Sequence, residues 1–293
     1  MIDLVCSKIE CWYPTFLCNR CASMHQYRLS PPIAPSPQLP SLRRSLNPLR
    51  FDSASLLPSK PPNVVMSPSD KLSIVPLFEN EIPVCAELLS RSFGHDAPFV
   101  DIYFPNHDTP SGQASVSSRL TAWQRSSLED SVFLKAVIRS SKDNKDGIIA
   151  GFCIWTLMKE PPPAELAKVE KVDEVWPDKD DREFMTRLWS KYVIPRSEVI
   201  KRSAGKGVYV LELLAVDPDH QRLGAGTALV AWGTRYADEL GIESVVEGTP
   251  VGRRCYENGG FHTEIEEMDF DTGEEFSGRR KPTLHFLTRQ PNT

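Results

Sequence analysis

The spacing of apolar residues predicts a mixed α/β domain over residues 71–290. Short apolar runs bounded by turn residues are typical of buried strands, and apolar residues three or four positions apart are typical of helices. A polar turn at 142–147 between two such runs predicts a hairpin, and Gly151 in its second strand predicts a β-bulge. The predicted strands are 72–77, 132–138, 148–158, 208–216, 242–247, 261–270 and 283–288. The predicted helices are 82–93, 115–127, 180–192 and 253–258, with a further helix from Thr227.

This order of elements implies one central sheet with helices on both of its faces. Two segments do not belong to the regular alternation. Residues 94–112 form a predicted loop rich in Pro, His and Asp, and residues 159–206 form a predicted helical insertion. Because the insertion precedes the strand at 208–216, we expect it to form one wall of a substrate-binding site. We expect the loop to form the opposite wall.

Residues 1–65 differ in composition from the rest of the chain. They contain 10 of the 25 prolines and carry a net charge of +4, so the remaining residues carry −9 of the total of −5. A proline-rich segment cannot form a regular ladder, and we predict a disordered, dispensable tail or an upstream extension of the gene model. Its Arg and Ser content also resembles a mitochondrial transit peptide, although its prolines disfavour the helix that such a peptide requires.

Composition excludes several classes of protein. There is no apolar run near eighteen residues, which argues against a membrane span, and the acidic net charge of −5 argues against a general nucleic-acid binder. Cys18 and Cys21 have the spacing of half a zinc site, but Cys6 and Cys11 are poorly spaced for the other half. We therefore expect a cytoplasmic protein, with mitochondrial import and a zinc-dependent interaction module as less favoured alternatives.

The turn at residues 221–226 is the strongest candidate for chemistry. Its sequence, Gln-Arg-Leu-Gly-Ala-Gly, lies between a predicted strand and a predicted helix. The two glycines allow a close approach of the backbone, and the first amides of the helix can donate to phosphate oxygens. Leu229 stands where a dinucleotide site has its third glycine, and Thr227-Ala228 replaces the Lys-Ser/Thr pair of a triphosphate loop. The turn therefore predicts a diphosphate site that belongs to neither of these two classes.

The pattern Q-x-x-G-x-G at 221–226, followed by Tyr256-Glu257 and then Gly260-Phe261, resembles the GCN5-related N-acetyltransferase (GNAT) superfamily. The resemblance implies a mixed, mostly antiparallel sheet whose fourth and fifth strands splay apart to admit acetyl-CoA. Family members often have Asn where this chain has Thr249. The cofactor-binding residues that the resemblance implies are Leu214, Ala215, Val216, Gln221, Arg222, Leu223, Gly224, Ala225, Gly226, Thr227 and Thr249.

Three side chains are candidates for the reaction itself. Tyr256 falls on the family tyrosine that protonates the leaving thiolate, and a phenol keeps its proton at neutral pH. Glu212 lies in an otherwise apolar strand and is the candidate general base, although many members use water instead. Glu247 is a candidate for binding a cationic substrate. The alternatives are a core tyrosine at position 256, a salt-bridged or exposed strand residue at 212, and a role for Glu247 in orienting water.

The resemblance implies transfer of an acetyl group from acetyl-CoA to a primary amine by direct attack in a ternary complex. We expect a small amine as the acceptor, in a monomer or homodimer. A protein or peptide acetyltransferase and a non-catalytic acyl-CoA-binding module remain alternatives. The segment 94–112 contains His95, Asp96, His107 and Asp108, a grouping typical of metal ligands, but the acyl transfer requires no metal and we expect none.

Overall fold

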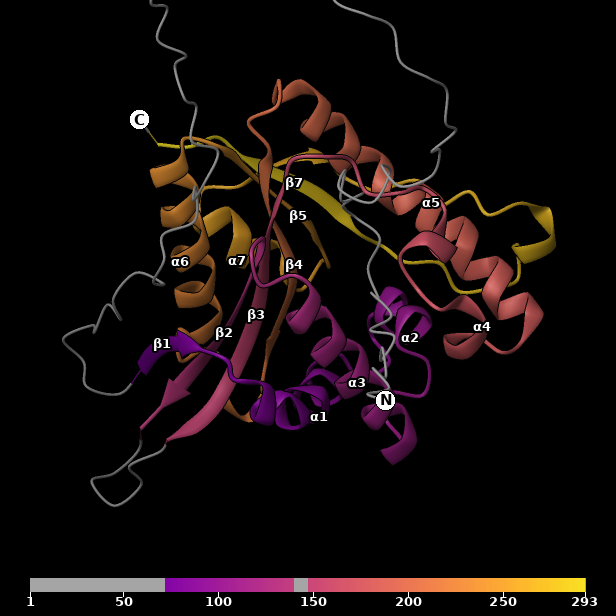
Figure 1. Cartoon of the computed structure of the whole chain (residues 1–293), viewed down its shortest axis with the longest axis horizontal. Coiled ribbons are helices and arrows are strands. Elements are labelled where there is room, and N and C mark those ends of the chain that lie inside the picture. Colours follow the sequence, from indigo (N-terminus) through magenta and orange to yellow (C-terminus); the bar gives the residue numbers. More distant parts are fainter. Residues whose placement is uncertain (1–71, 140–146, 293) are drawn as a thin grey trace, which may run out of the picture.

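The computed structural model describes residues 72–139 and 147–292, which build one seven-stranded mixed sheet (Figure 1). The strand order is β1–β2–β3–β4–β5–β7–β6, and every neighbouring pair is antiparallel except β4 and β5, which are parallel. The strands are β1 (Leu72–Pro76), β2 (Ser131–Ile138), β3 (Ile148–Met158), β4 (Val208–Val216), β5 (Glu243–Gly248), β6 (His262–Ile265) and β7 (His285–Arg289). The predictions for the tail at 1–65 and for most of the turn at 142–147 lie outside the described residues.

Helices cover both faces of this sheet, as predicted. The helices are α1 (Ile82–Phe93), α2 (Pro98–Tyr103), α3 (Pro110–Ser126), α4 (Val172–Val175), α5 (Lys179–Arg202), α6 (Ala225–Leu240) and α7 (Arg253–Asn258). One face packs against α1 and α3 over β2 to β4, and against α5 over β4, β5 and β7. The opposite face packs against α6, whose apolar side enters a core with β2, β3 and β4 (Figure 1).

Strands β2 and β3 form the predicted hairpin, and both are buried along most of their length. Its strands pair from Ser131 with Thr156 to Ile138 with Ile148. Ala136 opposes Gly151 and Val137 opposes Ile149, so one extra residue of β3 forms the predicted bulge. At Gly151 a Cβ would lie 2.8 Å from the Ala215 carbonyl oxygen of β4, which explains the glycine.

The parallel pair β4–β5 is joined at one end only. Its ladder covers three residue pairs, from Val208 with Glu243 to Val210 with Val245. Beyond Val210 the ladder ends, while β4 continues to Val216 beside β3 and β5 continues to Gly248 beside β7. The two strands therefore form the predicted V, which leaves one edge of β4 without a strand beside it.

Helix α5 is longer than its sequence pattern predicts. We expected it to end at Tyr192, three residues before Pro195, whereas it continues to Arg202. A proline inside a helix costs about 3 kcal/mol. The second half of α5 compensates by burying Val199 and Ile200 against the sheet. Packing thus overrides the local signal for a helix end.

Two other predicted segments need correction. The loop 94–112 contains helix α2 and the first turn of α3, which begins at Pro110 with Thr109 as its cap. The predicted strand at 261–270 is limited to β6. After β6, the carboxylates of Asp269 and Asp271 each accept a backbone N–H two residues onward, at 3.0 Å, and these turns replace the ladder.

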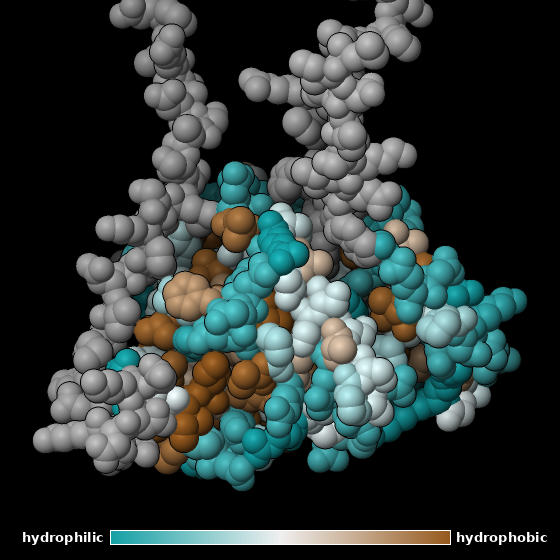
Figure 2. Space-filling model, turned by 60° about the horizontal axis from the view of Figure 1, so that its bottom comes forward, coloured by the Kyte–Doolittle hydropathy of each residue, from teal (hydrophilic) through white to brown (hydrophobic). Residues whose placement is uncertain are grey.

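Most apolar side chains of the described residues lie between the sheet and the helices on its two faces. Figure 2 shows one face of the molecule that is mostly hydrophilic, with apolar residues gathered toward its left side. Among the helices within 72–139 and 147–292, none is both long and apolar enough to cross a bilayer.

Candidate active site

One cavity of about 1560 Å³ extends from the N-terminus of α6, through the V of β4 and β5, to helices α2 and α5. A single small-molecule site typically occupies about 300–1,000 Å³. The cavity is therefore large enough to hold two substrates side by side.

Helix α6 supplies the anion-binding end of this cavity. Its first helical hydrogen bond runs from the Ala228 N–H to the Gly224 carbonyl at 2.9 Å. The amides of Ala225, Gly226 and Thr227 precede that bond and have no acceptor within the helix. The positive end of the helix dipole adds to their attraction for a diphosphate. The residues of this turn therefore suit a diphosphate group.

The turn before α6 adopts left-handed backbone at two positions. Gly224 has φ of 88°, and Arg222 has φ of 63°, which is uncommon for a residue with a side chain. Gly226 does not have a positive φ, and a Cβ there would make ordinary contacts at 3.5 Å with Val216 and 3.6 Å with Cys255. Only Gly224 is thus required by backbone conformation.

Tyr256 lies in α7 with its ring buried at the wall of the cavity. A Cβ at Gly248 would lie 2.7 Å from its ring, and one at Gly252 would lie 3.0 Å from the same ring atom. These two glycines therefore leave room for the tyrosine. Burial, together with the neighbouring Cys255 and Cys153, raises the pKa of Tyr256 above its ordinary value, so the phenol keeps its proton.

The turn after α7 contains two glycines with different roles. Gly260 has a left-handed φ of 87°, whereas Gly259 has φ of −83°. Gly259 is required because a Cβ there would lie 2.8 Å from Val230 of α6. This close approach of α7 to α6 places the Tyr256 segment beside the glycine turn.

Both candidate carboxylates contact one buried arginine from α5. Arg196 Nη1 lies 2.9 Å from Glu212 Oε2, Arg196 Nε lies 2.9 Å from Glu247 Oε1, and Arg196 Nη2 makes a further short contact with Glu247. The Arg196 and Glu247 side chains are each 1% exposed, whereas Glu212 is 10% exposed. Tyr192 completes the cluster, since its hydroxyl accepts from Arg196 at 2.8 Å and donates to Glu247 at 3.3 Å.

A second bulge aims Glu212 into this cluster. In the β3–β4 ladder Ile154 opposes Leu213 and Trp155 opposes Leu211, so Glu212 is the extra residue of β4. Burial raises the pKa of the Glu212 carboxyl, with Arg196 acting in the opposite direction. Glu212 is therefore a stronger base than an ordinary glutamate.

Aromatic rings form the wall of the cavity next to this cluster. Phe99 of α2 stacks on Tyr192 of α5 with ring centroids 4.4 Å apart, and Tyr103 stacks near Trp189 at 6.2 Å. All four rings line the cavity. The segment 94–112 and the insertion thus pack against each other and share one wall of the cavity, whereas the sequence led us to expect them on opposite walls.

The structure brings most of the predicted site residues to the cavity. Two predicted residues do not line the cavity. Ala215 is buried in the core beneath α1 and α3, and Leu223 is exposed on the surface. The predicted residues that line the cavity are Tyr256, Glu212, Glu247, Leu214, Val216, Gln221, Arg222, Gly224, Ala225, Gly226, Thr227 and Thr249.

Arg196 is the residue that sequence reasoning missed. It follows Leu188 and Tyr192 at intervals of four, so it occupies a position on their buried helix stripe. A charged residue in an apolar stripe requires a buried partner, and this was the available signal.

A splayed parallel strand pair, with a glycine turn and helix start at its mouth, is the arrangement of the GNAT fold. Residues 143–261 match the model of the acetyltransferase (GNAT) family. That segment, less than half of the chain, is therefore similar to the GNAT acetyltransferase family.

Solved structures show the same fold at low sequence identity. Arylalkylamine N-acetyltransferase 2 from Aedes aegypti is 18% identical, with a TM-score of 0.52, over 75% of this chain and 99% of that one. A mosquito arylalkylamine N-acetyltransferase like 5b is 13% identical, with a TM-score of 0.51, over 75% and 99%. The comparison with curated proteins yields no match.

Proposed function

We propose that this protein transfers an acetyl group from acetyl-CoA to the primary amine of a small molecule, by direct attack in a ternary complex. The observation that supports this proposal is that one cavity has an anion-binding helix terminus at one end and a buried carboxylate cluster at the other. These two ends suit a diphosphate donor and a cationic acceptor, respectively.

In this proposal the donor end holds coenzyme A by its pyrophosphate. The amides at the start of α6 donate to the phosphate oxygens, and Arg222 at the cavity wall adds a positive charge. The free edge of β4 at residues 214–216 presents backbone N–H groups that polarise the thioester carbonyl. Thr249 replaces the frequent family Asn beside the cofactor.

The acceptor end attracts the amine as an ammonium ion. When ionised, the two carboxylates and the guanidinium of Glu212, Glu247 and Arg196 sum to a net charge of −1. Glu212 is the more exposed carboxylate, and its raised pKa suits it to accept a proton from the amine, directly or through water. Glu247, fully buried against Arg196, holds the guanidinium in place rather than contacting the substrate.

The chemical step then requires two more proton transfers. The neutral amine attacks the thioester carbon, the C–S bond breaks, and Tyr256 protonates the leaving thiolate. Tyr256 keeps its proton until this point because burial raises its pKa. The nitrogen loses its second proton as the amide forms, and this proton restores the Tyr256 phenol through water, so that the products are the N-acetyl amine and free coenzyme A.

The aromatic wall favours an amine with an aromatic or otherwise apolar body. Phe99, Tyr103, Trp189 and Tyr192 offer ring faces next to the carboxylate cluster. Ring faces attract both cations and other rings. An aromatic wall beside a buried charge cluster favours a small molecule over a peptide segment, which requires an open groove.

The test measures thiol release from acetyl-CoA with a panel of arylalkylamines, alkylamines, polyamines and lysine peptides. We expect an arylalkylamine to give the highest kcat/KM. In Glu212→Gln, kcat/KM should fall by about 100-fold or more, because a general base contributes on that order. Its acetyl-CoA affinity, measured by calorimetry, should stay unchanged.

The matched control is Glu198→Gln, an exposed glutamate of α5 that should leave both quantities unchanged. Preference for lysine peptides would support a peptide acetyltransferase instead. Tight binding of acetyl-CoA without thiol release from any amine would support a non-catalytic module.

A further inference from the structure

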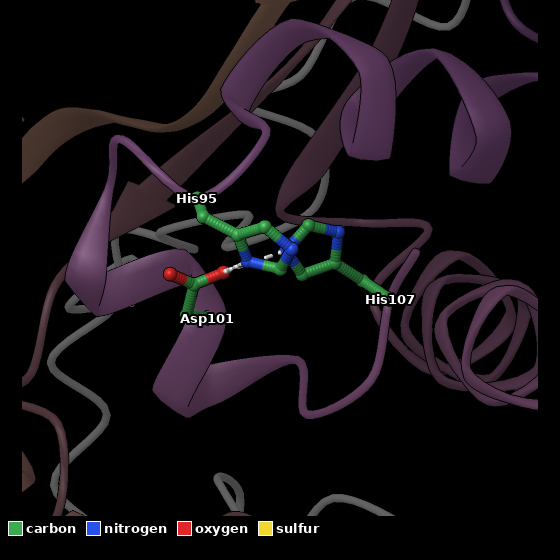
Figure 3. A group of neighbouring side chains, drawn as sticks. All are labelled: His95, Asp101 and His107. Atoms are coloured by element: carbon green, nitrogen blue, oxygen red, sulfur yellow. Dashed lines mark hydrogen bonds and ion pairs between the residues drawn. The ribbon is translucent and has the colours of Figure 1, made fainter. Parts of the chain in front are cut away.

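We propose that His95, Asp101 and His107 form a binding site for one divalent transition-metal ion of the Zn²⁺ type. The site lies in the segment between α1 and α3 and goes beyond the proposed acetyl transfer. Figure 3 shows the three side chains converging, with Asp101 carried by α2 and both histidines in the loops that flank it.

The ligand atoms already lie close to one another. Asp101 Oδ1 is 2.9 Å from His95 Nδ1 and 2.9 Å from His107 Nε2. One ligand atom from each of the three residues lies within 4.8 Å of the others. Two imidazoles and one carboxylate are a ligand set that suits Zn²⁺ and neighbouring metals.

The outer nitrogen of each histidine also has a partner. His107 Nδ1 lies 3.0 Å from the Ser90 hydroxyl, and His95 Nε2 lies 3.5 Å from Asp108 Oδ2. Metal-binding histidines typically bond through the second nitrogen to a carboxylate, carbonyl or similar group, which fixes the ring and its tautomer. Both rings here are oriented in this way, with their inner nitrogens directed toward the same carboxylate.

The position of the cluster allows an ion to enter and gives it a structural role. His107 is buried, whereas the His95 side chain is 66% exposed, so the site opens to solvent on one side. Residues 96–100, which lie between two of the proposed ligands, line the acceptor side of the cavity. The backbone carbonyl of His95 also accepts a hydrogen bond from Arg280 Nη1 at 2.5 Å. A bound ion would therefore anchor this wall of the cavity, without contact with the reacting atoms.

The experiment titrates the full chain, freed of metal by a chelator, with Co²⁺ and Zn²⁺. We expect one Co²⁺ per chain with the d–d absorption of nitrogen and oxygen ligands and no thiolate charge-transfer band. Zn²⁺ should displace it. His95→Ala and Asp101→Asn should abolish this signal, and Asp108→Asn should weaken affinity about tenfold, because it orients a ligand rather than binding the ion.

Two controls make the result decisive. His262→Ala removes an exposed histidine of β6 and should leave binding unchanged. Cys18→Ser combined with Cys21→Ser should also leave it unchanged, because the proposed ligands are nitrogen and oxygen. Thermal unfolding must show that each variant is folded, which the exposure of His95 favours. Absence of binding, unchanged binding in His95→Ala, or binding lost with the cysteines would overturn the proposal.

Discussion

Single residues at the start of α6 decide whether an anion can approach the backbone. Gly224 has a left-handed φ of 88°, so a side chain there would be strained whatever its chemistry. Gly226 is free of that constraint, and a Cβ there would make only ordinary contacts, the nearest at 3.5 Å. Gly226 is therefore the position at which charge can be changed without changing conformation.

Gly226→Asp should reduce affinity for acetyl-CoA by about 10- to 100-fold, which corresponds to roughly 1.4–2.8 kcal/mol. The new carboxylate would repel a pyrophosphate, whereas an acidic residue in the first helical turn stabilises the fold by about 0.3–1 kcal/mol. Calorimetry measures the first effect and thermal unfolding the second. Gly226→Ala is the matched control and should bind like the parent chain; equal affinity in the Asp variant would refute the phosphate turn.

At the scale of elements, the position of α6 over the sheet depends on one close contact. A Cβ at Gly233 would lie 2.0 Å from Trp155 Cε2, and Trp155 is completely buried in β3. The helix backbone therefore rests directly on the indole ring. This contact fixes the distance of α6 from β3 and so helps to place the anion-binding terminus of the same helix.

Gly233→Ala should destabilise the protein by about 1–3 kcal/mol, because a buried ring cannot move away from the added methyl group. Helix propensity alone predicts the opposite, a gain of about 1 kcal/mol. Chemical denaturation measures the difference. Gly278→Ala, where nothing lies within 4 Å of the added Cβ, should be nearly neutral. A stabilised Gly233→Ala would show that α6 does not rest on Trp155.

At the scale of the whole molecule, one ion pair joins the end of α6 to the last strand. Arg289 of β7 donates to both oxygens of Asp238, at 2.7 and 2.8 Å, and the Asn292 N–H donates to the same carboxylate at 2.8 Å. The Arg289 hydrogen bonds lower the pKa of the Asp238 carboxyl below its ordinary value of 3.8. The ionised carboxylate is thus favoured in the folded state.

Asp238→Asn should lower the free energy of unfolding by about 1–3 kcal/mol at neutral pH, a typical range for charge-assisted hydrogen bonds. As pH falls below 3.8, the unfolded chain binds the proton first, and the stabilisation is lost toward the lower folded pKa. The gap in Tm between the two proteins should therefore be largest near neutral pH and close in acid. Asp173→Asn, an exposed control, should give little gap at any pH; a gap that does not narrow as the pH falls below 3.8 would contradict the ion-pair account.

Much of the fold and the donor end of the cavity could be predicted because their signals are local. Strand periodicity, the glycine turn at 221–226 and the Tyr256 segment each lie within a few consecutive residues, where backbone conformation follows from side-chain type. The same local rules failed for α5. Pro195 indicates a helix end, but the helix continues to Arg202 because its last turns pack against the sheet.

By itself, the sequence determined most of the order of the elements, the family resemblance and the glycine turn proposed to bind a diphosphate. Only the tertiary structure decided which charges meet. Arg196 contacts Glu212 across 16 residues and Glu247 across 51, and α2 places Asp101 between His95 and His107. Such pairs depend on how helices pack on the sheet, because a buried charge takes whichever partner the fold brings within reach. The glycine turn was therefore visible in the chain, whereas the acceptor site and the His–Asp–His cluster exist only once the walls of the cavity are assembled.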